Sequence, residues 1–239
     1  MFNRLAQYAG ALLLLQGLGG CSNENNPAAE STSMPTSTVA TSAAASWEQA
    51  ADARLVVAFG DSLYAGYGLG PKESFPVKLE QALKAKGIAV TISNAGVSGN
   101  TTAEAQRRLA FTLDGFQRKP DLMMVNLGGN DMLRGIDPKE TRANLTAICE
   151  ELKRRGIPIL LTGMIAAPNM GADYADRFNA IYPDLAKKYD AALYPFFLDG
   201  VATNPALMQA DHVHPTAQGI DVIVGKVEPL VAKRLAASD

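Results

Sequence analysis

Short apolar segments alternate with longer amphipathic segments from about residue 54 onward. Five segments are almost continuously apolar and are followed within a few residues by Gly, Asn, Asp or Pro: 55–59, 88–92, 122–127, 157–162 and 191–196. Such runs are typical of parallel strands that are buried on both faces. The pattern therefore predicts five strands.

The segments between these strands have helical periodicity. After Pro138, four side chains follow i, i+3, i+4, i+7 spacing, at Leu145, Ile148, Cys149 and Leu152. The last segment repeats this spacing at Ile220, Ile223, Val224, Val227, Leu230 and Val231. Repeated strand and helix predict one domain, residues 51–239, with a parallel sheet, right-handed crossovers and helices on both faces.

The first twenty residues have the features of a secretory leader. Arg4 precedes an apolar run around residues 11–15, which is shorter than the roughly 20 residues that span a bilayer. Leu18-Gly19-Gly20-Cys21 resembles the lipobox of bacterial lipoproteins, in which the cysteine is lipidated and becomes the mature N-terminus. We expect a signal peptide at residues 1–20 and lipidation of Cys21. Ordinary cleavage near Gly20 is the alternative.

Residues 21–50 are rich in Ser, Thr, Ala, Pro, Asn and Glu and carry few large apolar side chains. Such a segment buries too little surface to offset its ordering entropy, so it is predicted to be a flexible linker with a reach of roughly 25–30 Å. Leader, linker and Cys21 together predict a lipid-anchored protein on the periplasmic face of the bacterial cell envelope. The alternative is a protein secreted into the periplasm.

Composition excludes several classes of protein. The chain is 47% hydrophobic and 19% charged, with a formal net charge of −2 and no block of Lys or Arg, so no nucleic-acid partner is expected. Cys21 and Cys149 have no Cys-x-x-Cys partner, which argues against a zinc knuckle or a disulfide framework. Cys149 falls on the apolar face of its predicted helix and is expected to be an inert core thiol.

The first predicted strand leads into Gly60-Asp61-Ser62-Leu63. A serine in a strand-to-helix turn can expose its hydroxyl at the edge of the sheet, with its own N–H pointing the same way. Asp61 and Ser62 could instead only start the following helix. The pattern is not the Gly-x-Ser-x-Gly elbow of α/β-hydrolases, which separates the chain from that fold family.

Two more predicted strands are followed by polar turns. In the second turn, Gly99 would let a substrate approach the backbone and would offer an N–H, although Thr101 or Thr102 also suits a helix N-cap. The third turn is Gly128-Gly129-Asn130-Asp131, where Asn130 could direct its amide into the same crevice or could belong to an ordinary turn. Ligands of parallel sheets lie beyond the carboxyl ends of the strands, so chemistry is expected at these turns.

The two histidines of the chain both lie in Asp211-His212-Val213-His214-Pro215, before the last predicted helix. An aspartate three residues before a histidine can accept from its Nδ1–H and leave Nε2 free as a base, and Asp211 with His214 has this spacing. His212 is expected to be peripheral, because adjacent residues point apart. A His-x-His metal pair would lack a third ligand nearby, so no metal site is predicted.

These motifs occur in the order of the four blocks of the SGNH (GDSL) hydrolase superfamily and cover residues 60–215. Residues 128–135 and 167–171 resemble, more specifically, the bacterial branch of thioesterase I, arylesterase and lysophospholipase L1. The resemblance implies a flavodoxin-like three-layer α/β/α sandwich with a five-stranded parallel sheet. It also implies an esterase that needs no metal and no cofactor.

Carried over by position, the resemblance implies that Ser62 is the nucleophile, that His214 is the general base and that Asp211 orients it. The N–H groups of Ser62 and Gly99 and the side chain of Asn130 would form the oxyanion hole. The expected reaction is hydrolysis of an ester or thioester through an acyl-enzyme. The alternatives are a carbohydrate O-acetylesterase with the same residues and a non-catalytic surface module that binds acyl or glycan ligands.

Two predicted loops are unusually apolar and are expected to contact a small-molecule ester. The predicted contacts are Met132, Leu133, Arg134, Ile165, Pro168 and Met170. The two loops could instead pack against each other, and a solvated Arg134 is an alternative to one that meets an anionic headgroup. Further candidate walls, among which the sequence gives no preference, are Tyr64, Tyr67, Tyr174 and Tyr182. No obligate protein partner is indicated.

Overall fold

The computed structural model describes residues 53–237. These residues include the predicted hydrolase domain except for its first two and last two positions. The predicted signal peptide, the lipidation site Cys21 and the linker lie outside the described residues. Within residues 53–237, no helix combines the length and the apolar character that a membrane crossing requires.

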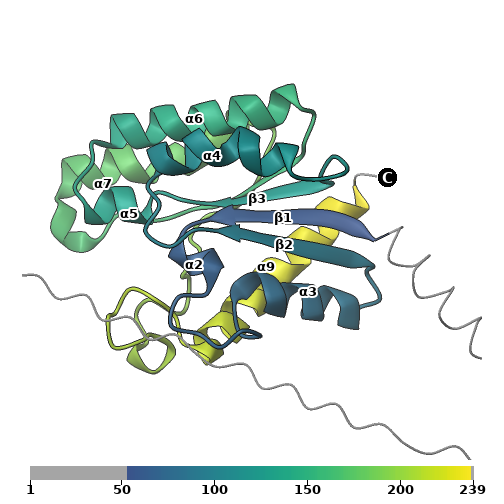
Figure 1. Ribbon diagram of the computed structural model, residues 1–239. Coiled ribbons are helices and arrows are strands. Elements are labelled where there is room, and N and C mark those ends of the chain that lie inside the picture. The colour runs from purple at the N-terminus through teal and green to yellow at the C-terminus, as the bar shows by residue number, and fades with distance from the viewer. Residues whose placement is uncertain (1–52, 238–239) are drawn as a thin grey trace, which may run out of the picture. The chain divides into compact units, whose positions relative to one another are not determined.

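Five strands form one parallel sheet in the order β2-β1-β3-β4-β5 (Figure 1). They are β1 (Arg54–Gly60), β2 (Val90–Gly96), β3 (Leu122–Asn126), β4 (Ile159–Thr162) and β5 (Ala192–Tyr194). All residues of β3 and β4 are buried, which explains their continuous apolar sequences. From β1 the chain adds β2 on one side of the sheet and then β3, β4 and β5 on the other side. The strand order therefore reverses between β1 and β3, and sheets of this kind bind ligands at the carboxyl end of such a switch point.

Helices cover both faces of the sheet, which confirms the predicted three-layer α/β/α fold (Figure 1). One face carries α3 (Phe75–Ala85) and α9 (Ala217–Ala236), and the other carries α4 (Thr102–Asp114), α6 (Pro138–Arg154) and α8 (Ile181–Tyr189). The shorter elements are α2 (Ser62–Ala65), α5 (Gly129–Leu133), α7 (Ala172–Asn179), η1 (Pro168–Met170) and η2 (Pro205–Leu207).

The predicted helical faces are the ones that the structure buries. In α6, all four predicted core side chains are buried, and burial raises the pKa of the free thiol Cys149 to about 12. In α9, the predicted face is buried except for Leu230, which is partly exposed. These faces attach the helices to the sheet and so fix the loops at its carboxyl edge.

The second strand differs most from its prediction. It begins at Val90 rather than residue 88 and continues to Gly96, because it pairs in register with β1 up to the pair Gly60 and Gly96. A Cβ atom on Gly96 would lie 2.4 Å from the backbone nitrogen of Ala65, so only glycine lets β2 approach α2 this closely. The end of β2 therefore lies directly beside the turn that carries Ser62.

Candidate active site

Ser62 is the first residue of α2, just beyond the carboxyl end of β1. Asp61 caps this helix, because its Oδ1 accepts a hydrogen bond of 3.0 Å from the Leu63 N–H. The Ser62 Oγ lies 2.8 Å from Nε2 of His214. The Ser62 N–H donates to no acceptor within the described part of the chain. The turn thus starts a helix and also presents a hydroxyl and an amide.

His214 bridges Ser62 and Asp211. Its Nδ1 lies 2.6 Å from Oδ2 of Asp211, whose Oδ1 accepts hydrogen bonds of 3.0 Å from the N–H groups of Val213 and His214. Partial burial raises the pKa of Asp211, but the hydrogen bonds from the imidazole and the two amides outweigh it and lower the pKa to about 2. A carboxylate at Nδ1 favours the tautomer that leaves Nε2 free to accept the Ser62 proton.

The turn that carries His214 is attached to the rest of the domain by Gln209 and Tyr67. The Gln209 side-chain amide donates to the carbonyls of Tyr67 (2.8 Å) and Pro215 (2.9 Å). The backbone N–H of Gln209 donates to the His214 carbonyl (2.7 Å). The Tyr67 ring lies against the imidazole of His214, with 4.6 Å between the ring centroids. The sequence gives no signal for this contact, because the two residues are far apart in the chain.

Asn130 lies on α5 and contacts the turn that carries Ser62. Its Nδ2 donates to Oδ2 of Asp61 (3.2 Å) and to the carbonyl of Asn100 (3.1 Å). Gly99, in the connection from β2 to α4, has φ +80°, and its N–H has no acceptor among residues 53–237. The three predicted oxyanion donors therefore come from the ends of three neighbouring strands, β1, β2 and β3.

Asp61 contributes more to this site than the start of a helix, because it also contacts Asn130. Burial raises its pKa to about 6, against the opposing effects of the Leu63 N–H, the charge of His214 and the Asn130 amide. Its contact with Asn130 joins the β1 turn to the β3 turn. The only sequence signal was its position immediately before Ser62.

Asp131 is fully buried and connects three helices at the oxyanion side. Its carboxylate accepts hydrogen bonds from the Thr102 N–H (2.8 Å), the Thr102 hydroxyl and the Thr141 hydroxyl (3.3 Å). Thr101 caps α4 through a capping box with Glu104. These bonds hold the starts of α4 and α6 against α5, and so fix the Gly99 loop relative to Asn130.

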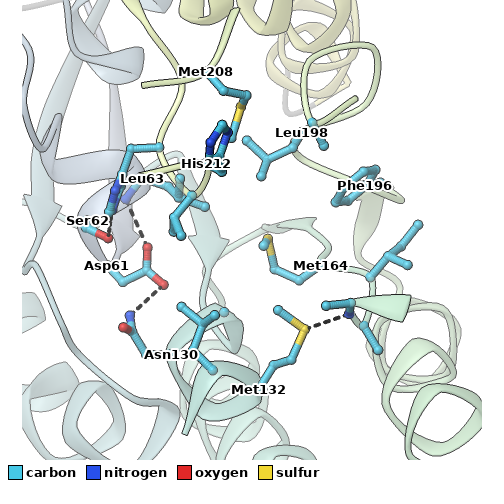
Figure 2. Close-up of a pocket in the computed structure, with 18 of the residues that line it drawn as sticks. Asp61, Ser62, Leu63, Asn130, Met132, Met164, Phe196, Leu198, Met208 and His212 are labelled. Atoms are coloured by element: carbon cyan, nitrogen blue, oxygen red, sulfur yellow. Dashed lines mark hydrogen bonds between the residues drawn. The ribbon is translucent and has the colours of Figure 1, made fainter. Parts of the chain in front are cut away.

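A cavity of about 550 Å³ opens beside Ser62. Figure 2 shows Asp61, Ser62 and Asn130 on one side of it and mostly apolar side chains on the other. Four of the predicted substrate contacts line it: Met132, Leu133, Ile165 and Pro168. The rest of its apolar wall comes from residues that the sequence did not single out, among them Met164, Phe196, Leu198 and Met208. The cavity suits an acyl or aryl group.

Two predicted substrate contacts lie outside the lining of this cavity. Arg134 does not line the cavity, because its guanidinium donates to the Gly99 carbonyl (2.7 Å) and lies 3.8 Å from the Glu104 carboxylate. Met170, the last residue of η1, does not line it either, because its side chain packs against the hydrophobic core. Arg134 thus supports the loop that carries a predicted oxyanion donor.

The four candidate tyrosines are also absent from the cavity lining. Three of them make hydrogen bonds inside the domain: Tyr64 with the Thr162 hydroxyl, Tyr174 with the Ile136 carbonyl and Tyr182 with the Leu127 carbonyl. The fourth, Tyr67, contacts His214.

His212 lies closer to the chemistry than its predicted peripheral position. It lines the cavity, on the side formed by Leu198 and Met208 (Figure 2). Among the described residues, no three His, Cys, Asp or Glu side chains gather as a metal site would require. His214, the other histidine of the sequence pair, is engaged by Asp211 and Ser62.

Comparison with known proteins agrees with this geometry. Residues 58–222 match the GDSL-like Lipase/Acylhydrolase family. The chain is 38% identical over 187 residues to an arylesterase of Vibrio mimicus, across 78% of this chain and 92% of that protein. It is 35% identical over 187 residues to thioesterase 1/protease 1/lysophospholipase L1 of Escherichia coli K12, across 77% of this chain and 88% of that protein.

Solved structures show the same relationship. AlinE4, an SGNH-hydrolase family esterase, is 57% identical, with a TM-score of 0.66 over 76% of this chain and 96% of its own. TesA is 32% identical, with a TM-score of 0.71 over 76% of this chain and 99% of its own. The ordered motifs, the fold and these relatives lead to one conclusion: the chain belongs to the GDSL-like lipase/acylhydrolase family.

Proposed function

We propose that the chain is a lipid-anchored serine esterase of the bacterial cell envelope that hydrolyses small carboxylic esters or thioesters with acyl or aryl groups. Its family and its arylesterase and thioesterase relatives make it an ester hydrolase. The observation that carries the proposal is the hydrogen-bonded chain from Ser62 through His214 to Asp211, which opens onto an apolar cavity.

The first half of the reaction forms the acyl-enzyme. The Ser62 Oγ bonds to the substrate carbonyl carbon while its proton passes to Nε2 of His214, and Asp211 stabilises the resulting imidazolium. The oxyanion accepts hydrogen bonds from the Ser62 and Gly99 N–H groups and from the Asn130 side chain. The C–O or C–S bond then breaks, and the leaving alcohol or thiol takes the proton from Nε2.

The second half releases the acid. Water gives a proton to Nε2 of His214 and attacks the acyl carbon, and the same donors stabilise the second oxyanion. When this intermediate collapses, the bond to Ser62 breaks and Nε2 returns the proton to Oγ. Both halves use one base and one oxyanion hole, so a single cavity is sufficient for the complete cycle.

Labelling with a fluorophosphonate tests the nucleophile. We expect one covalent adduct per chain, on Ser62, detected by mass spectrometry of the peptides, and no adduct on the Ser62→Ala variant. Thr216→Ala, a hydroxyl variant at the N-cap of α9, should label like the wild type. A wild-type protein that takes no phosphonate would contradict the proposal and would favour a module that only binds ligands.

A substrate panel distinguishes the activities that share this site. Acetyl, butyryl and longer acyl esters, aryl esters, an acyl thioester and an acetylated sugar should be compared by kcat/KM. The apolar wall predicts that aryl and medium-chain acyl esters react faster than the acetylated sugar. Preference for the acetylated sugar would support a carbohydrate O-acetylesterase instead.

A further inference from the structure

Apart from Asp61, which holds Asn130, the cavity contains two polar side chains that the proposed reaction does not use. Asp61, Ser62, Asn130 and His214 line it and are hydrogen-bonded as described above. Thr203 and His212 also line it, both from the connection between β5 and α9. Both residues are exposed, and neither side chain makes a hydrogen bond with any residue between 53 and 237. They are free to bind a ligand.

His212 has a backbone conformation that a histidine adopts at a cost. Its φ is +56°, and among the residues of known placement only Asp190 is another non-glycine residue with positive φ. Hydrogen bonds within the turn hold this conformation. The His212 N–H donates to the Gln209 carbonyl (3.0 Å), and the carboxylate of Asp211 accepts from the N–H groups of Val213 and His214. Glycine would satisfy this turn without strain. A strained residue at the edge of an active site points to a role for its side chain.

The position of His212 indicates which part of the substrate it meets. In the tetrahedral intermediate, the oxyanion faces Asn130, while the leaving oxygen must lie near Nε2 of His214 to be protonated. Val213 and His212 extend the same turn along the cavity wall. The group attached to the leaving oxygen therefore lies alongside His212. The wall near Met132 and Pro168 is apolar and suits the acyl group.

We propose that His212, assisted by Thr203, forms a polar subsite that binds hydroxyl groups of the alcohol part of the ester. An imidazole has one nitrogen that donates and one that accepts, and the threonine hydroxyl does both, so each of these side chains can bind a hydroxyl group of a polyol, which a plain alkyl alcohol does not offer. The preferred substrate class is then the monoacyl ester of a polyol. This inference rests on the proposed esterase function and specifies its substrate.

Two butyrate esters test the subsite directly. Glyceryl monobutyrate and propyl butyrate have the same acyl group and a three-carbon alcohol, and they differ only in the hydroxyl groups of the alcohol. We expect the full chain to have a higher kcat/KM for the glyceryl ester. His212→Gly should lower the ratio of the two kcat/KM values about three- to tenfold, mainly through KM of the glyceryl ester, as expected for one hydrogen bond. Thr203→Val should lower the ratio in the same direction.

Two further variants separate recognition from backbone strain. His212→Asn keeps a hydrogen-bonding side chain that tolerates positive φ, so it should retain part of the preference. Asp190→Gly relieves the same kind of strain at the end of α8, away from the cavity, and should leave the ratio unchanged.

The outcomes separate this inference from the proposed function. A ratio that His212→Gly leaves unchanged, or an equal loss on both esters, contradicts the polyol subsite while hydrolysis itself stands. If the wild-type chain hydrolyses neither ester, the proposed function and the subsite fail together.

Discussion

Ser62, Asn130 and His214 reach the cavity from three different segments of the chain, and neighbouring groups orient His214 and Asn130. Asp211 holds His214, and Asp61 with the Asn100 carbonyl holds Asn130. Both protons of the Asn130 amide are engaged in these resting contacts. An oxyanion that replaces the neutral Asn100 carbonyl as acceptor would form a charge-assisted hydrogen bond in its place, which puts the stabilisation in the transition state.

Removing the Asn130 amide tests this role. We expect Asn130→Ala to lower kcat on an aryl ester by about 10²–10³-fold with a modest change in KM, because one oxyanion donor is lost. Asn144→Ala is a matched control, since its amide donates to the Thr102 hydroxyl outside the cavity lining. An unchanged kcat for Asn130→Ala in steady-state kinetics would exclude the residue from the oxyanion hole.

Removing the imidazole of His214 should be more damaging. His214→Ala leaves Ser62 without a proton acceptor and the leaving group without a proton donor, so we expect kcat to fall by about 10⁴-fold or more. Stopped assays with high enzyme concentration can measure the residual rate. Near-normal turnover would show that another group acts as the base.

Asp61 makes the stability of the domain depend on pH. Its pKa is about 6 in the folded chain, above the value of 3.8 for an unperturbed aspartate, so the folded state holds the proton more tightly. The associated stabilisation is complete below pH 4 and is lost as pH rises through 6. By linkage, the titration of Asp61 should lower the free energy of unfolding of the wild type by about 2–3 kcal/mol between pH 4 and pH 7.

Urea unfolding at both pH values measures this loss. Asp61→Asn cannot titrate, so the difference in unfolding free energy between wild type and variant should change by that amount between pH 4 and pH 7. A difference that is independent of pH would show that Asp61 titrates normally in the folded domain.

At the scale of elements, α5 and the starts of α4 and α6 act as one unit, because Asp131 of α5 accepts hydrogen bonds from Thr102 of α4 and Thr141 of α6. Asp131→Ala leaves the buried donors of Thr102 and Thr141 without their acceptor, which should lower the free energy of unfolding by about 2–4 kcal/mol. Thr141→Val removes only the longest of these bonds and should cost about 1 kcal/mol. Equal losses in urea unfolding would contradict this arrangement.

The hydrophobic pattern predicted the elements in which burial follows a simple rule, with either every residue or one helical face buried. It located β3 and β4 because every residue in them is buried, and it located the core faces of α6 and α9. It missed the end of β2, because residues 94–96 are neither apolar nor alternating and pairing with β1 alone extends the strand. When pairing with a neighbouring strand decides where a strand ends, the residues of that strand alone do not predict its end.

The same distinction applies to the candidate site. Ser62, Asp211 and His214 were predictable because their motifs lie at the ends of elements and have fixed spacing. The contacts from Asp61 to Asn130 and from Tyr67 to His214 depend on side chains that only folding brings together. The contacts of Arg134 were missed for a related reason, since its partners Gly99 and Glu104 lie on another loop and helix.

At the scale of the whole molecule, the proposed anchor remains a prediction from residues 18–21. Cys21→Ser should move the protein from the membrane fraction to the soluble fraction of cells, because the lipid acceptor is lost. Cys149→Ser is the control, since this thiol is buried in α6. Mass spectrometry of the mature N-terminus should show a diacylglyceryl adduct on Cys21, and an unmodified cysteine would contradict the anchor.

The direction of β1 has a practical consequence. The strand begins at Arg54 and ends at Gly60, two residues before Ser62. Its seven residues therefore separate the amino end of the sheet, where the chain enters, from the carboxyl end, where Ser62 lies, by about 20–25 Å. If the protein is attached to a bead or an electrode through the chain before Arg54, the support lies at the amino end of the sheet. The opening of the cavity at the carboxyl end then stays accessible to bulky reagents. Coupling through the segment between β5 and α9 would obstruct that mouth.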